Sequence, residues 1–261
     1  MSDERDLADG DASDSARRDA QDSVAARRLQ MVERQLVGRG VRDPDVLAAM
    51  RAVPRHLFVP DDLQQAAYDD SPLPIGFGQT ISQPYMVACM TELLRVNVRS
   101  RVLDVGAGSG YQTAVLAELA GEVYAIERIA TLEEEARERL ATMGYDNVAV
   151  LLGDGTGGWA EHAPYDGIMV AAATAQAPPP LLDQLAEGGR LVIPLGEAHQ
   201  DQILTIYERQ GADFTVERAL RCRFVPLVGA VRRASDDGPA EEDRGEGHAD
   251  DEPGSWREVE P

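Results

Sequence analysis

The sequence contains no lysine, and all 25 of its basic residues are arginine. Aspartate and glutamate number 46, which gives a formal net charge of −21 at pH 7. Because basic side chains that neutralise phosphates supply most sequence-independent affinity for nucleic acid, this balance argues against a nucleic-acid partner. A salt-rich habitat and GC-rich coding both produce acidic chains without lysine.

Cysteine and histidine are scarce as well. Cys89 and Cys222 lie far apart in the chain and the four histidines are scattered, so we expect neither a disulfide framework nor a metal site. No apolar run reaches the roughly 20 residues of a membrane-spanning helix, and the acidic N-terminus is unlike a signal peptide. We therefore expect a soluble, cytoplasmic protein without a membrane partner.

Large apolar side chains are nearly absent from both ends of the chain. Residues 1–23 hold eight acids and three arginines, and residues 235–261 hold eleven acids and two arginines. Such segments bury too little apolar surface to offset the entropy lost on ordering, so we predict two disordered acidic tails. The body, 24–234, suits one domain with a helical and loop extension over 24–98 and an α/β core over 99–234.

The extension and the core differ in their sequence patterns. Residues 24–51 have a helical pattern with a stop at Gly40, and Asp43 followed by Pro44 predicts the start of a second helix. The proline- and glycine-rich stretch that follows, as far as Gly78, is predicted to be mostly irregular. From Arg101 onward, short apolar runs alternate with helical segments; the runs are RVLDV, EVYAIE, NVAVLLGDG, YDGIMVAAA and RLVIPLG.

Repeated β–α units predict an α/β fold with a doubly wound, mostly parallel, Rossmann-like sheet. The final segments QILTIYER, FTVERAL and FVPLVG have no long helix between them, so we expect an antiparallel C-terminal element. The helix after the second strand carries a capping-box pattern, Thr131 with Glu134, and a stop at Gly144.

A glycine turn follows the first strand of the core. Gly106, Gly108 and Gly110 stand where a backbone needs positive φ or must let a ligand approach closely. A dinucleotide fingerprint would need glycine at position 111, where Tyr111 stands, and a P-loop would need a lysine. A glycine-rich loop without a ligand is the alternative at this point.

Acidic residues end three successive predicted strands: Asp104, Glu127 and Asp154. Open α/β sheets bind ligands at this edge, so we expect the three carboxylates to surround one crevice. Glu127 suits a ribose diol, Asp154 an adenine amino group, and Asp104 an ammonium group or the turn itself. Each acid alone could instead be a strand-end cap. Together, without a phosphate clamp, they favour a cationic adenosyl ligand such as S-adenosylmethionine.

The hydroxyl-rich loop TISQPYM lies about 20 residues before the glycine turn. One interpretation is that Ser82 or Gln83 caps a helix that begins at Pro84. A cap does not account for Thr80 or for the glycines at 76 and 78, so the other interpretation makes the loop a wall of the same pocket. The two interpretations are compatible.

Several segments, in this order, resemble the protein-L-isoaspartate O-methyltransferase family: GQTISQPYM, RVLDVGAGSGYQTAVLA, GDG, YDGIMVAAA, QLAEGGRLVIPLG and RFVPLVG. The resemblance covers about residues 29 to 230 and neither tail. It implies a class I methyltransferase domain over 24–234. It also implies that S-adenosylmethionine is used to methylate the α-carboxyl of L-isoaspartyl residues in damaged proteins and peptides, which begins their repair through a succinimide. The family is usually monomeric.

The resemblance also implies the site residues. Ser82 takes the active-site position. Cofactor contacts would come from Thr80, Ile81, Ser82, Gly106, Gly108, Gly110, Glu127, Arg128, Asp154 and Gly155, to which the position at a strand end adds Asp104. Substrate contacts would come from Ser82, Arg223, Val225, Pro226 and Leu227.

Three other functions stay open on the residues alone. The first is a methyltransferase for another substrate class; net acidity and the lack of an Asn/Asp-Pro-Pro-aromatic motif after IMVAAA disfavour a nucleic-acid base. The second is a nicotinamide oxidoreductase, which Tyr111 disfavours. The third is a binding module that keeps the cofactor fold without turnover.

Overall fold

The protein is described here by a computed structural model over residues 23–197 and 200–229. The two predicted acidic tails lie outside the described residues, apart from Ser23, which begins a helix over residues 23–31. Within the described ranges, none of the helices has the length and apolar character to cross a membrane.

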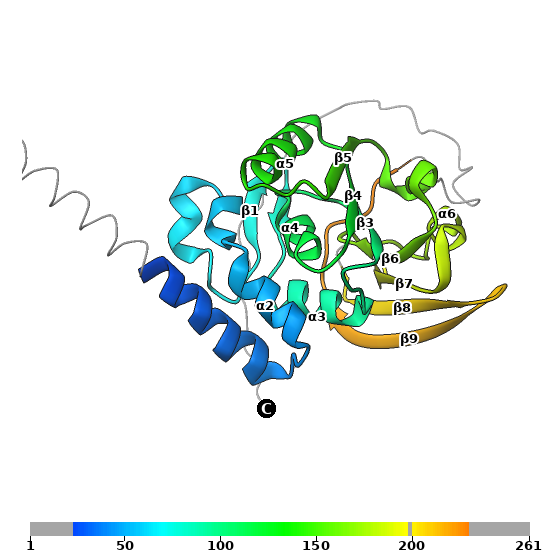
Figure 1. Cartoon of the computed structure of the whole chain (residues 1–261), viewed down its shortest axis with the longest axis horizontal. Helices are drawn as coiled ribbons and strands as arrows, with labels where there is room; N and C mark the ends of the chain where they lie inside the picture. The colour runs from blue at the N-terminus through cyan, green and yellow to red at the C-terminus, as the bar shows by residue number, and fades with distance from the viewer. Residues whose placement is uncertain (1–22, 198–199, 230–261) are drawn as a thin grey trace, which may run out of the picture. The chain divides into compact units, whose positions relative to one another are not determined.

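Seven strands form the central sheet in the order β5-β4-β3-β6-β7-β8-β9 (Figure 1). The strands are β3 (Arg101–Val105), β4 (Glu122–Glu127), β5 (Val148–Leu152), β6 (Tyr165–Val170), β7 (Leu185–Leu195), β8 (Gln202–Gln210) and β9 (Asp213–Cys222). The five strands β5, β4, β3, β6 and β7 pair in parallel, whereas β8 and β9 are added antiparallel. The predicted mostly parallel sheet with an antiparallel C-terminal element is confirmed.

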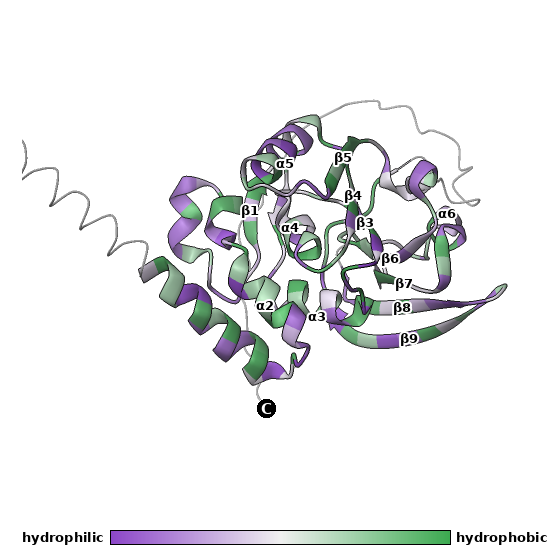
Figure 2. Cartoon of the chain, viewed as in Figure 1, coloured by the Kyte–Doolittle hydropathy of each residue, from purple (hydrophilic) through white to green (hydrophobic). Residues whose placement is uncertain are grey.

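Helices precede the sheet and connect its strands. The long ones are α2 (Pro44–Ala52), α3 (Pro84–Leu94), α4 (Tyr111–Ala117) and α5 (Ala130–Thr142), and α6 (Pro179–Asp183) is short. The helix over residues 23–31 continues into η1 (Val32–Leu36) and η2 (Val37–Arg39) and ends at Gly40, whose φ is 102°. This N-terminal helix alternates hydrophobic and hydrophilic residues (Figure 2), and its continuation buries Val32 and Leu36 in the core.

One helix start follows the sequence prediction and another does not. The Asp43 side chain accepts hydrogen bonds from Asp45 N and Val46 N, and Pro44 takes the first helical position of α2, as predicted. The predicted capping box at Thr131 is wrong, since α5 begins one residue earlier, at Ala130. The acceptor for the backbone N–H groups before α5 is instead the carboxylate of Glu127, at the end of β4.

The stretch predicted to be irregular contains short ordered elements. They are η3 (Arg55–Phe58), η4 (Asp61–Ala66) and a hairpin of β1 (Leu73–Gly76) with β2 (Gln79–Ile81). The hairpin turns through Phe77 and Gly78, with φ values of 53° and 69°. The short 3₁₀ turns and strands leave no long hydrophobic period in the sequence, so the pattern could not reveal them.

Candidate active site

A cavity of about 520 Å³ lies at the carboxyl ends of β3, β4 and β6. Its wall includes the residues that follow β3, the last residues of β4, and Ala171 and Ala172 after β6. The chain runs outward from β3 to β4 and β5, then returns to place β6 on the other side of β3 (Figure 1). This reversal of strand order is where open α/β sheets bind ligands, and the volume suits a small molecule.

The glycine turn forms one wall of the cavity. Gly106, Gly108 and Gly110 have φ values of 91°, 55° and 87°, in the left-handed region that favours glycine. Gly106 N and Ala107 N both donate to Ile126 O, at 2.9 and 3.1 Å, so the turn is fixed to the end of β4. Gly106 and Gly108 line the cavity, whereas Gly110 lies at the N-cap position of α4.

Glu127 is the acidic residue of this wall. Its side chain is nearly buried, with the residue 5% exposed. One carboxylate oxygen accepts from Gly108 N at 2.9 Å, and the other accepts from Arg128 N and Ile129 N at 2.8 and 2.9 Å. These three hydrogen bonds hold the carboxylate rigidly. Because a carboxylate offers about four acceptor positions, it can still accept a hydrogen bond from a ligand.

The expected ring of three acids is not formed at the cavity wall. Asp104 is fully buried and accepts a 2.6 Å hydrogen bond from Thr113 Oγ1, which matches the alternative that it orders the turn. Burial raises the pKa of Asp104 to about 7, and its Oδ1 has no hydrogen-bond partner among the described residues. Asp154 Oδ1 caps η5 (Gly155–Gly157) by accepting from Thr156 N and Oγ1. Of the three acids, Glu127 lines the cavity.

The hydroxyl-rich loop forms part of a second wall. Thr80, Ile81 and Ser82 all line the cavity, at the end of β2 and just before α3. Helix α3 begins at Pro84, with Gln83 at its N-cap position and no side-chain cap bond among the described residues. The geometry therefore matches the pocket-wall interpretation of Ser82 and not the capping one.

A segment beyond β9 completes this second wall. Arg223, Val225, Pro226 and Leu227 line the cavity. Val225 O accepts from Ala173 N at 2.8 Å and Leu227 N donates to Ala173 O at 2.7 Å. The predicted final strand is thus reduced to a single parallel bridge beside Pro226.

Two further predicted residues lie in the wall, and several wall residues were missed. Arg128 and Gly155 line the cavity beside the glycine turn. A Cβ at Gly155 would lie 2.4 Å from Val105 Cγ1, so this position has no room for a side chain. Sequence reasoning missed Gln112, although its place in the first turn after the glycines was a usable signal. The other missed wall residues include Met90, Ser109, Ala171 and Ala172.

In the described part of the chain, no group of three or more histidine, cysteine, aspartate or glutamate side chains is placed to hold a metal ion. The polar groups of the cavity wall include the hydroxyls of Thr80 and Ser82, backbone groups and the Glu127 carboxylate.

Known proteins share this architecture. Residues 27–232 match the model of the family described as protein-L-isoaspartate(D-aspartate) O-methyltransferase. The protein-L-isoaspartate O-methyltransferase of Synechococcus sp. (strain JA-2-3B'a(2-13)) is 55% identical over 216 residues, which is 80% of this chain and 88% of the relative. That of Picosynechococcus sp. (strain ATCC 27264 / PCC 7002 / PR-6) is 52% identical over 208 residues, 80% of this chain and 93% of the relative.

A solved structure has a similar fold. It is described as a protein-L-isoaspartate O-methyltransferase from Plasmodium falciparum in complex with S-adenosyl-L-homocysteine. It matches this chain with a TM-score of 0.68 and 28% sequence identity, over 77% of this chain and 98% of that chain.

Proposed function

This chain belongs to the protein-L-isoaspartate(D-aspartate) O-methyltransferase family, and from that premise we propose how its cavity divides the reaction between two walls. The enzyme uses S-adenosylmethionine to methylate isoaspartyl residues of damaged proteins and peptides, the first step of their repair. The observation that carries the residue-level proposal is the cavity itself, which brings together the hydroxyl loop, the glycine turn with Glu127 and the 223–228 segment.

The glycine-turn wall fits S-adenosylmethionine. Positive φ at Gly106 and Gly108 lets a ligand approach the backbone, and Gly155 stands where Val105 leaves no room for a Cβ. We assign the ribose hydroxyls to the remaining acceptor positions of Glu127. The other cofactor contacts in this proposal are Thr80, Ile81, Ser82 and Arg128, whereas Asp104, Gly110 and Asp154 support the wall from behind.

The reaction does not need a general base from the protein. The cofactor supplies an electrophilic methyl group on a sulfonium. The substrate α-carboxylate has a reference pKa of about 4 or below, so it is ionised at neutral pH and needs no general base. The protein accelerates the reaction by aligning this carboxylate and removing its water.

Ser82 is the residue we assign to that alignment. Its hydroxyl can donate a hydrogen bond to one carboxylate oxygen and leave the other oxygen free to attack. A neutral donor holds the anion without the strong ion pair that would reduce its nucleophilicity. Because Ser82 lines the cavity and does not cap α3, its hydroxyl is available for this contact.

The 223–228 segment is the proposed site for the substrate backbone. It forms a single bridge, through Ala173, and an extended peptide can add to such an exposed edge through main-chain hydrogen bonds. Arg223, whose side chain is 71% exposed, adds a positive charge beside the cavity of a strongly acidic protein.

Methyl transfer suffices for repair because the methyl ester can lose methanol, whereas the ionised carboxylate has no good leaving group. The neighbouring backbone nitrogen attacks the ester carbonyl, expels methanol and closes a succinimide, and water opens that ring partly to normal aspartate. The protein therefore needs only to recognise the abnormal linkage and form the ester.

A paired-peptide assay tests the function. Two peptides that differ only in a normal or an isoaspartyl linkage are incubated with the full chain and methyl-labelled cofactor. We expect base-labile label on the isoaspartyl peptide alone. Label on both peptides would indicate another substrate class, and cofactor binding without any transfer would indicate a binding module.

We further propose a cytoplasmic monomer that has no nucleic-acid or membrane partner. Both Cys89 and Cys222 are free thiols, which suits a reducing compartment, and a net charge of −21 disfavours phosphate-rich partners. We also propose that 24–98 and 99–234 act as extension and core of one methyltransferase domain. Light scattering after size exclusion tests the monomer; a mass of twice 28.2 kDa would contradict it.

A further inference from the structure

We propose that Gln202 is a positioning residue, whose side-chain amide holds the 223–228 segment in place for the substrate peptide. The proposal rests on the function assigned above, in that it names the anchor of the proposed substrate wall. Gln202 is the first residue of β8 and does not line the cavity, so it acts through the segment and not on the reacting groups.

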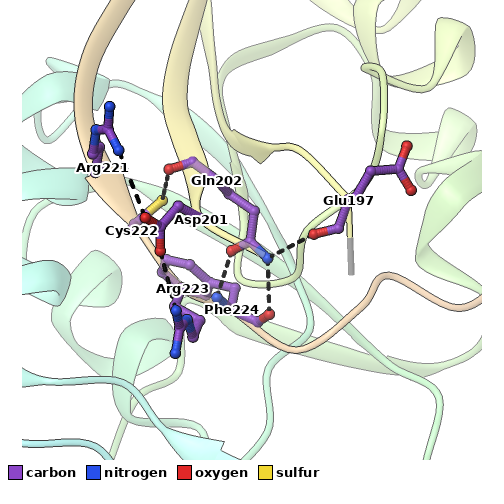
Figure 3. A network of polar contacts seen from close by, with 7 residues as sticks. All are labelled: Glu197, Asp201, Gln202, Arg221, Cys222, Arg223 and Phe224. Carbon is purple, nitrogen blue, oxygen red and sulfur yellow. Dashed lines mark hydrogen bonds and ion pairs between the residues drawn. The ribbon is translucent and has the colours of Figure 1, made fainter. Parts of the chain in front are cut away.

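The amide of Gln202 replaces a missing neighbouring strand. Gln202 is fully buried, and its Oε1 accepts from Phe224 N at 2.7 Å (Figure 3). Its Nε2 lies 3.4 Å from both Phe224 O and Glu197 O. One side chain thus satisfies both backbone polar groups of Phe224, as a paired strand would do.

A second anchor acts further along the segment. Ala173 bonds to Val225 O and Leu227 N through its backbone. Gln202 therefore holds Phe224, and Ala173, in the loop after β6, holds Val225 and Leu227. Without the amide, the backbone hydrogen bonds that the described residues leave to this segment are those to Ala173, so its N-terminal half would lose its register against the cavity.

The ion pairs nearby are weaker candidates for this role. Asp201 contacts Arg223 at 3.1 Å and Arg221 at 3.6 Å (Figure 3), but these arginine side chains are 71% and 80% exposed. Exposed ion pairs contribute little because water and salt screen them. The buried amide is therefore the anchor that we expect to control the segment.

A second buried glutamine provides a matched control. Gln184 is 9% exposed; its Nε2 donates to Gly157 O at 2.8 Å and its Oε1 accepts from Trp159 N at 2.9 Å. The two glutamines thus hold backbone in the same way. Gly157 and Trp159 are not among the residues that line the cavity, so loss of this amide should leave the peptide site intact.

The test compares Gln202→Met with Gln184→Met in the full chain. Methionine keeps the volume of the side chain and removes its polar atoms. For Gln202→Met we expect a roughly tenfold higher KM for an isoaspartyl peptide, as for the loss of one or two buried hydrogen bonds, with the Kd for S-adenosylhomocysteine within twofold of wild type. Hydrogen–deuterium exchange should be faster over 223–228. Gln184→Met should change neither the peptide KM nor the exchange over 223–228.

Two outcomes would overturn the proposal. One is an unchanged peptide KM with unchanged exchange in Gln202→Met, and the other is an equal rise in KM for both variants, which would indicate a general loss of stability. If Gln202→Met does not fold, the hydrogen–deuterium exchange rate of the Phe224 backbone amide in the wild-type protein provides the test. Rapid exchange of this amide would contradict the anchor. A wild-type enzyme inactive on isoaspartyl peptides would refute the proposed function instead, and the exchange measurement on 223–228 would still test the anchor.

Discussion

The two walls of the cavity are held in different ways. The glycine-turn wall is fixed by the sheet itself, because Gly106, Ala107 and Gly108 bond to the last two residues of β4. The second wall consists of a short hairpin end and a segment outside the central sheet, and this segment is anchored by Ala173 and by the amide of Gln202. Changes in the first wall should therefore reduce stability and cofactor binding together. Changes in the second should mainly affect turnover and peptide recognition.

Removal of the Glu127 carboxylate is the most severe way to test the first wall. Glu127→Ala leaves the N–H groups of Gly108, Arg128 and Ile129 without their acceptor. We expect a loss of about 3 kcal/mol in the free energy of unfolding and at least a hundredfold (~2.8 kcal/mol) in affinity for S-adenosylhomocysteine. Urea unfolding and calorimetric titration measure the two effects.

The control for Glu127 stands at the other end of the same strand. Glu122 forms an exposed ion pair with Arg101, so Glu122→Ala should change the free energy of unfolding by less than about 1 kcal/mol. If both variants weakened cofactor binding equally, the assignment of Glu127 to the site would be wrong.

The second wall is tested next through Ser82. Ser82→Ala should lower kcat by about ten- to a hundredfold, in line with a lost positioning hydrogen bond, with the free energy of unfolding unchanged within about 0.5 kcal/mol. Steady-state kinetics with the isoaspartyl peptide provide the measurement, and Ser71→Ala, outside the cavity wall, is the control. Turnover equal to that of the wild type would leave Ser82 without a role in the reaction.

A pair of glycines sharpens the comparison within one turn. A Cβ at Gly155 would lie 2.4 Å from Val105 Cγ1, whereas a Cβ at Gly157 would meet nothing within 4 Å. Gly155→Ala should therefore weaken S-adenosylhomocysteine binding about tenfold and lower the free energy of unfolding by about 1–2 kcal/mol, and Gly157→Ala should do neither. Equal effects of the two substitutions would show that steric contact with Val105 is not the cause.

The smallest effect concerns the pH dependence of the first wall. Burial raises the pKa of Asp104 from 3.8 to about 7; Thr113 opposes the shift and Glu127 adds to it. An acid with a raised pKa stabilises the fold only while protonated, so this contribution is complete below about pH 4 and is lost as the pH rises to about 7.

Substitution of Asp104 isolates that contribution. At 1.4 kcal/mol per unit, the two units between pH 5 and a pKa of about 7 set an upper limit of about 2.7 kcal/mol on the change. The stability of Asp104→Asn relative to wild type should rise by about 1 kcal/mol between pH 5 and pH 8, below that limit because the buried site relaxes. Urea unfolding at the two pH values provides the measurement. A difference that does not change with pH would mean that Asp104 is already ionised at pH 5.

The features that sequence could predict are local ones. Strands β3 and β4 show as short apolar runs, and the glycines and Glu127 follow them directly, so both the sheet and its ligand-binding edge were predictable. Pro44 after Asp43 likewise marked the start of α2 by neighbouring residues alone.

The features that sequence could not predict depend on distant partners. Asp104 and Asp154 occupy the expected strand ends, but hydrogen bonds from Thr113 and Thr156 hold their carboxylates, and neither acid lines the cavity. Gln202 gives no local signal, because its partner Phe224 lies 22 residues later. The position of a residue followed from the strand pattern, whereas the orientation of its side chain depended on tertiary contacts.

The cap at Asp154 has a consequence for the working life of the enzyme. Aspartate followed by glycine is prone to spontaneous ageing, since glycine has no side chain to hinder attack by its own amide nitrogen on the aspartate carboxyl group. This chain places one such pair, Asp154 with Gly155, beside its catalytic chamber, which Gly155 lines. Two hydrogen bonds from Thr156 hold the vulnerable carboxylate at the start of η5. We expect them to slow ring closure at this pair, and so to protect the catalyst there from the deterioration whose repair it begins in other proteins.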